Sequence, residues 1–171
     1  MLREDIAKIH QIIQRQIGLH RQLLDAVRAE REALISADLK RIQDITTLKQ
    51  SVLNKIQRVE TERLQFLAEL VVTFKKPLRE LTLTNIIVIA QGEDIKAAEQ
   101  LRSGYNALNV LIQRITEQNK DNKILVEKSL EHVFEMKKNV LGESVPKSEL
   151  YTPRGQKIGG IGGARLISKE A

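Results

Sequence analysis

Few side chains in this sequence could do chemistry, and their spacing does not form a recognisable site. The three histidines are His10, His20 and His132. None has a second histidine three or four residues away, the spacing that places two metal ligands on one helix face. Cysteine is absent, which excludes thiolate metal sites and Cys nucleophiles. No phosphate loop or nucleophile elbow occurs. We therefore expect no enzyme, no metal and no cofactor.

The charged residues are dispersed along the chain. Carboxylates such as Glu60, Glu62, Asp94 and Glu131 lie among basic residues, as on solvated helix faces. The net charge is +6, but the basic residues are not interleaved with aromatic ones, so we expect no nucleic-acid partner. The longest apolar run, 86–90, is far shorter than the roughly 20 residues of a membrane span. No secretory signal pattern is visible, so we expect a cytoplasmic protein without direct membrane insertion.

Composition and periodicity predict long helices. Aromatic residues make up 3% of the chain and prolines number three, which argues against β-sandwiches and barrels. Apolar residues recur at helical spacing over 2–36 and 39–74. Either Ser36 or Asp38 can cap the second helix. The second apolar seam contains Lys49 and Arg63, whose stems can lie on the apolar face.

Residues 78–91 allow two interpretations. Pro77 ends the second helix, and alternation followed by β-branched residues resembles a strand. A strand without a partner in the chain has nothing to pair with, so we expect a short helix packed on the bundle. The strand would matter if it paired with another chain.

The clearest periodic segment is 93–141, where the seam alternates steps of three and four residues. It predicts a long left-handed packing seam. The seam is formed by Ala98, Leu101, Tyr105, Leu108, Ile112, Ile115, Asn119, Asn122, Val126, Ser129, Val133, Met136 and Val140. Its polar members either fix register, as a buried Asn does in coiled coils, or face solvent. Apolar residues on more than one face of 122–141 indicate either a partner-binding surface or burial within a three-helix bundle.

The last 30 residues differ in composition. Gly142, Pro146 and Pro153 oppose helix continuation, and five glycines follow residue 154. We expect an all-α fold: an elongated antiparallel bundle or coiled coil of three long helices and one short helix over 1–141, with a disordered tail over 142–171. Tyr151 in that tail is either incidental or a docking anchor.

Three stretches, taken in order, resemble the FlgN family of flagellar type III export chaperones. The first is Glu30-x-x-Ala33-Leu34-x-x-x-Asp38-Leu39, with Lys49-x-x-x-Leu53 and Glu62-Arg63 after it. The second is Asn119-x-x-Asn122-x-x-Leu125-x-x-x-Ser129-Leu130, and the third is Tyr151-x-x-x-Gly155. The Gly-rich extension beyond Gly155 departs from the family pattern.

The resemblance implies a bacterial cytoplasmic chaperone of hook-filament junction proteins, the flagellar hook-associated proteins. It would bind their terminal helices, prevent premature assembly and deliver them to the export gate. The implied substrate-binding residues are Asn119, Asn122, Leu125, Val126, Ser129, Leu130, Val133 and Phe134. Tyr151 and Gly155 would dock to the cytoplasmic domain of the export-gate membrane protein, and the export ATPase complex is a further implied partner.

Two other classes compete with this interpretation. A structural coiled-coil adaptor or self-oligomerising helical protein would bury Leu125, Leu130 and Phe134 in a stable homo-oligomer. A basic nucleic-acid accessory protein would bind with a steep salt dependence.

Overall fold

A computed structural model describes residues 2–141 and shows four α-helices and one short 3₁₀ helix in that range, which confirms the predicted all-α class. The helices are α1 (Leu2–Ile35), α2 (Leu39–Phe74), α3 (Leu83–Glu93) and α4 (Ile95–Leu141), and the 3₁₀ helix η1 is Leu78–Glu80. Tyr151, Gly155 and the predicted tail lie outside the described residues.

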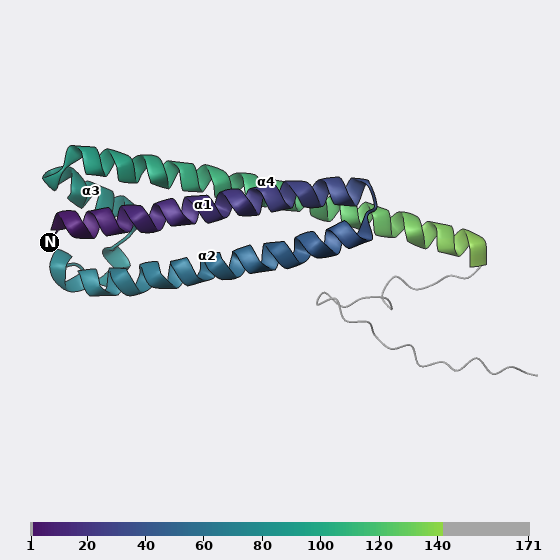
Figure 1. The fold of residues 1–171 in the computed structure, drawn as a ribbon, viewed down its shortest axis with the longest axis horizontal. Helices are drawn as coiled ribbons and strands as arrows, with labels where there is room; N and C mark the ends of the chain where they lie inside the picture. Colours follow the sequence, from purple (N-terminus) through teal and green to yellow (C-terminus); the bar gives the residue numbers. More distant parts are fainter. Residues whose placement is uncertain (1, 142–171) are drawn as a thin grey trace, which may run out of the picture. The chain divides into compact units, whose positions relative to one another are not determined.

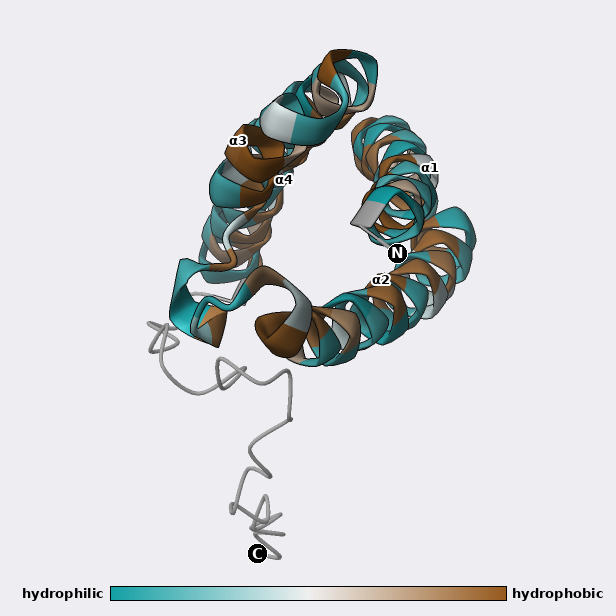
Figure 2. Ribbon diagram, turned by 90° about the vertical axis from the view of Figure 1, so that its left-hand side faces the viewer, coloured by the Kyte–Doolittle hydropathy of each residue, from teal (hydrophilic) through white to brown (hydrophobic). Residues whose placement is uncertain are grey.

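The described residues divide into two units, with the boundary between Leu125 and Val126 inside α4. The division predicted at residue 141 therefore stays a prediction. In the first unit α1 and α2 form an antiparallel hairpin, and α4 runs beside it in the direction of α1 (Figure 1). The strongly hydrophobic α3 lies at the end where α1 begins (Figure 2).

Local signals in the sequence set the ends of the helices. Asp38 caps α2, since its Oδ1 accepts a hydrogen bond from the Arg41 amide at 3.0 Å. Ala37 between the two helices has a φ of 52°. Thr82 caps α3, and Asp94 Oδ1 accepts from the Ala97 amide at the start of α4. Of the two residues predicted as possible caps, Asp38 is therefore the N-cap of α2 and Ser36 is not.

Within 78–91 the structure shows a 3₁₀ turn at Leu78–Glu80 and then α3 from Leu83, as predicted for a short helix, because the Pro77 break is followed by the Thr82 cap. The predicted start of the long helix at residue 93 was wrong. Gly92 and Glu93 belong to α3, and the long helix begins at Ile95.

The largest core cluster joins the first half of α1, the second half of α2, α3 and the start of α4. Ile13 in α1 and Leu101 in α4 have no exposed surface. Gly104 lies where the two helices approach closely, because a Cβ there would be 3.1 Å from Ile13 Cγ2. The first part of the α4 seam is therefore a structural contact. In the described range, no helix meets the length and hydropathy that a membrane span requires.

Candidate partner-binding surfaces

The α4 seam changes from buried to exposed along its length. Ala98 and Leu101 are buried and Ile115 is 7% exposed, whereas the positions after residue 125 are open to solvent. We define the α4 stripe as the large apolar residues exposed there: Val126 (38%), Leu130 (45%), Val133 (60%), Met136 (55%) and Val140 (79%). These residues recur at steps of three and four and so share one side of the helix. Within the part of the chain that the structure describes, the stripe is an exposed apolar helix face, a kind of surface that suits the binding of another helix.

Most of the predicted site residues lie on or beside the stripe. Val126, Leu130 and Val133 belong to it. Phe134 beside it is half-buried, and Ser129 is exposed within the same turns. Leu125 is half-buried at the end of the first unit.

Asn122 differs from these residues, because it is only 3% exposed and hydrogen-bonded inside the fold. Its Nδ2 donates to the Val27 carbonyl and to Glu30 Oε2, both at 2.9 Å. The side chain of Gln118 donates in turn to Asn122 Oδ1 at 3.3 Å. An amide with this many partners in the fold is not available to a substrate unless α4 moves, so its predicted role in substrate binding stays a prediction.

A polar junction joins all three long helices. It is formed by Glu30, Lys49, Asn119 and Asn122. Lys49 Nζ from α2 lies 2.9 and 2.8 Å from the two carboxylate oxygens of Glu30 in α1. It also donates to Asn119 Oδ1 at 3.4 Å in α4. The Lys49 and Glu30 side chains are only 18% and 16% exposed, so each charge depends on the other for compensation. This confirms that Lys49 lies on the apolar seam, with its charge satisfied by a carboxylate.

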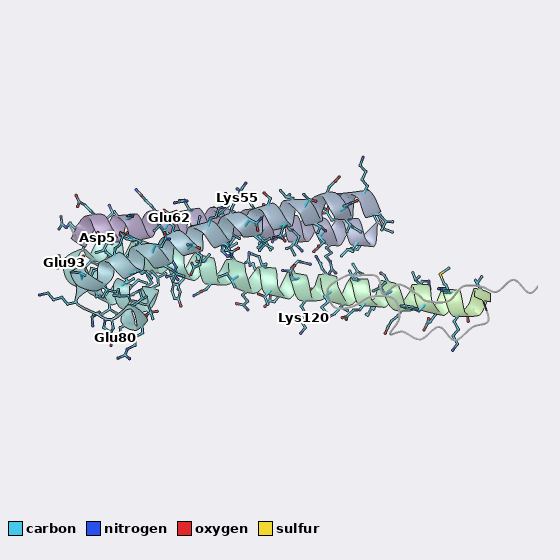
Figure 3. The ribbon with its side chains drawn as sticks, turned by 90° about the horizontal axis from the view of Figure 1, so that it is seen from below. Asp5, Lys55, Glu62, Glu80, Glu93 and Lys120 are labelled. Carbon is cyan, nitrogen blue, oxygen red and sulfur yellow. The ribbon has the colours of Figure 1, made fainter. Side chains whose placement is uncertain are left out.

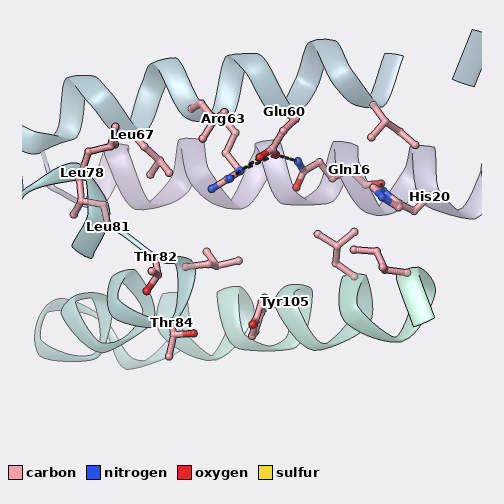
Figure 4. Close-up of a pocket in the computed structure, with 15 residues that line it drawn as sticks. Gln16, His20, Glu60, Arg63, Leu67, Leu78, Leu81, Thr82, Thr84 and Tyr105 are labelled. Carbon is pink, nitrogen blue, oxygen red and sulfur yellow. Dashed lines mark hydrogen bonds and ion pairs between the residues drawn. The ribbon is translucent and has the colours of Figure 1, made fainter. Parts of the chain in front are cut away.

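A groove of about 610 Å³ opens between α2, the η1–α3 connection and α4 (Figure 4). Its walls are mostly aliphatic, with Leu64, Leu78 and Ile112 between 42% and 48% exposed. The lining residues are Gln16, His20, Ile56, Glu60, Arg63, Leu64, Leu67, Leu78, Leu81, Thr82, Leu83, Thr84, Tyr105, Leu108 and Ile112. All of them lie in the first unit.

One ion pair lies in the groove. Arg63 donates to both Glu60 oxygens, at 2.8 and 2.6 Å, and Gln16 donates to Glu60 Oε2 at 2.7 Å (Figure 4). The Arg63 hydrogen bonds lower the pKa of Glu60 below its ordinary value, against the opposing effect of burial. The pair is therefore charged and mutually neutralised at neutral pH. Glu62, the residue before Arg63, pairs instead with Arg15 of α1 at 2.7 Å.

The remaining polar groups do not converge on a reaction centre. His20 Nδ1 is 2.7 Å from the Gln16 carbonyl, and His10 Nε2 is 3.2 Å from the Gln14 side chain. Over residues 2–141, no group of three His, Asp or Glu side chains could hold a metal ion. Charged side chains such as Lys55 and Lys120 are exposed on the helices (Figure 3). The chemistry that these surfaces offer is recognition of another apolar surface.

The groove was not predicted from the sequence. A signal was present, because the apolar face of α2 is wider than one neighbouring helix can cover, and Leu67 of this wider face lines the groove. Periodicity shows that a face is apolar, but it does not show how far two helices stand apart. Only the structure shows that α2 and α4 leave this space.

The comparisons with known proteins gave one match. Residues 1–158 match the family described as FlgN protein. No curated protein and no solved structure matches the chain at a significant level.

The polar junction leads to a stability prediction. Replacing Asn122 with Ala removes the hydrogen bonds to the Val27 carbonyl and to Glu30 Oε2, so that Lys49 alone of these two donors still reaches the Glu30 carboxylate. We therefore expect a loss of about 1–3 kcal/mol in unfolding free energy. The matched control is Asn109→Ala, an exposed position of α4, with an expected change below about 0.5 kcal/mol. Urea unfolding followed by circular dichroism measures both. Equal stability of the two variants would show that the junction does not hold α4.

Proposed function

Since the chain belongs to the FlgN family of flagellar export chaperones, we propose that it binds the terminal helices of flagellar hook-associated proteins through the α4 stripe. Binding covers the apolar faces by which those proteins assemble, and so prevents premature assembly in the cytoplasm. The chaperone then delivers its substrate to the type III export gate. The observation that carries the proposal is the row of five large apolar side chains, 38–79% exposed, on residues 126–140 of one helix.

The chemistry of the stripe suits a helical partner. Val126, Leu130 and Val133 lie at i, i+4 and i+7, the spacing with which one amphipathic helix anchors on another. The charges around them nearly cancel, since Glu127, Glu131 and Glu135 are matched by Lys128, Lys137 and Lys138. The surface therefore selects by apolar shape and little by net charge. Such recognition is releasable, as export of the substrate requires.

The residues that bind and those that position have separate roles in this proposal. In this proposal the contact surface is formed or bordered by Leu125, Val126, Ser129, Leu130, Val133 and Phe134. Asn119 and Asn122, which the family resemblance also implies in binding, hold α4 on the α1–α2 hairpin through the polar junction.

A charge introduced into the stripe tests substrate binding. Leu130→Asp combined with Val133→Asp places two carboxylates in the apolar contact, so we expect at least a 100-fold weaker affinity for a purified hook-associated protein, measured by calorimetry. Helix content should be nearly unchanged, because both side chains are exposed. The matched control is Lys128→Asp, outside the stripe on the same helix, which should bind within a few-fold of the original chain. Retained binding by the double variant would locate the site elsewhere.

Delivery to the export gate is proposed to use Tyr151 and Gly155, which follow the helix in sequence. A tyrosine offers a large contact area at a low entropy cost and suits a docking anchor. The proposed partner is the cytoplasmic domain of the export-gate membrane protein, with the export ATPase complex as a further contact.

Tyr151→Ala separates delivery from substrate binding. We expect weaker binding to the purified gate domain, by roughly 10-fold or more, because one aromatic anchor is lost. Affinity for the hook-associated protein should remain the same. Pull-down and calorimetry with both partners measure the difference. Loss of both affinities, or of neither, would contradict this division of roles.

A further inference from the structure

A second groove, of about 380 Å³, lies on the α1–α2 hairpin and is separate from the groove between α2 and α4. None of its lining residues belongs to α4, and Lys55 projects from the hairpin on the side away from Lys120 of α4 (Figure 3). The lining residues are Arg15, Gly18, Leu19, Gln22, Lys55, Arg58 and Val59, and we call this surface the basic groove. We propose that the basic groove binds an acidic amphipathic segment of a partner protein. This contact goes beyond the substrate binding proposed above, because the basic groove shares no residue with the α4 stripe.

The basic groove carries positive charge that the fold does not neutralise. Three of its seven lining residues are cationic and none is acidic. The Arg15 charge is compensated, since its Nη1 donates to both oxygens of Glu62 at 2.7 and 2.8 Å. Lys55 and Arg58 are exposed, and neither forms an ion pair within residues 2–141. Two carboxylates of a partner would therefore meet two cations for which no acidic side chain competes.

Gly18 leaves open space in the basic groove. A glycine inside a helix lowers the stability of the helix relative to alanine, a cost that a close packing contact can offset. Gly104 has such a contact, since a Cβ there would lie 3.1 Å from Ile13 Cγ2. Gly18 has none, because a Cβ built on it meets no atom within 4 Å. A side chain of the partner can enter this space beside Leu19 and Val59.

The arrangement of charge and apolar surface indicates the kind of segment that fits. Since α1 and α2 are antiparallel (Figure 1), the basic groove runs from Arg15, whose pair with Glu62 joins the two helices, to Gln22 and Lys55 at its other end. The distance from residue 15 to residue 22 is about 10 Å, or two helical turns, at about 1.5 Å per residue.

The two walls differ in charge. The α2 wall presents the uncompensated cations, and the α1 wall presents the space above Gly18. A helix with apolar residues at i, i+4 and i+7 and with carboxylates on the adjacent side fits both walls over this length. No aromatic side chain lines the basic groove, so the bases of a nucleic acid would find no stacking surface there.

Peptide binding to the full chain tests the charged and the apolar contact separately. The probe is a synthetic fluorescent peptide of about 20 residues with leucines at i, i+4 and i+7 and a glutamate after each leucine. We expect it to bind at least about 10-fold tighter than a peptide with lysine in place of each glutamate, measured by fluorescence anisotropy. It should also bind at least about 5-fold tighter than a peptide with serine in place of each leucine. Equal binding of the three peptides, or tighter binding of a single-stranded oligonucleotide of the same net charge, would overturn the proposal.

Variants of the basic groove locate the contact. Lys55→Gln combined with Arg58→Gln should weaken binding of the acidic peptide by at least about 5-fold, because both uncompensated charges are lost. The matched control, Arg114→Gln combined with Lys120→Gln, removes the same two positive charges from exposed positions of α4 and should bind within about 2-fold of the original chain. Equal affinities of the two double variants would show that net charge alone attracts the peptide, and would overturn the proposal.

Gly18→Gln tests the space without changing the charge. The added side chain should weaken binding of the acidic peptide by about 10-fold, because it occupies the room that the partner would use. The urea midpoint of unfolding should be retained or raised, since the new Cβ meets no neighbour and glutamine favours a helix. Full binding by this variant would overturn the proposal. Its affinity for the hook-associated protein should remain unchanged, so loss of the basic-groove contact is distinguishable from failure of the proposed function.

Discussion

One partly buried charge pair, Lys49 with Glu30, links the three long helices through hydrogen bonds. Lys49 and Glu30 lie on the facing sides of α2 and α1, where their charges are mostly removed from water. Glu30 also accepts from Asn122, and Lys49 donates to Asn119, so α4 joins the hairpin through the same two charged groups. Moving α4 would leave buried polar groups without partners, which costs more than losing an equivalent apolar contact. The junction therefore fixes the register of α4.

This junction marks the place where the role of α4 changes. Before it, Ala98, Leu101 and Ile115 of the seam are buried, and Ile112, 42% exposed, lines the groove. After it, the same periodic pattern continues through Val133 and Val140, but these residues are 60% and 79% exposed. One amphipathic repeat thus supplies the core of the fold and, further along, a surface with the same chemistry as that core. Under the proposed function, a helical partner would meet a surface patterned for helix packing.

The sequence predicted the helices well, because apolar periodicity and capping residues are local signals. The break at Pro77 and the cap at Asp38 are examples. It predicted less about which seam residues are covered by other helices. The apolar periodicity of the α4 seam is the same at Ile115 and at Val133, although only Ile115 is buried. The roles of Asn122 and of the groove depend on contacts between residues such as Glu30 and Asn122, far apart in sequence. Periodicity carries no information on such contacts.

The central claim is that α4 has a fold-forming part before the polar junction and a partner-binding part after it. Hydrogen exchange of the full chain tests this most directly, because local opening reports how much tertiary contact holds each turn. The account predicts strong protection over 98–122 and rapid exchange over 126–140, with protection of the second segment gained when a purified hook-associated protein is added. Equal protection of both segments in the free chain, or no gain over 126–140 on binding, would contradict it.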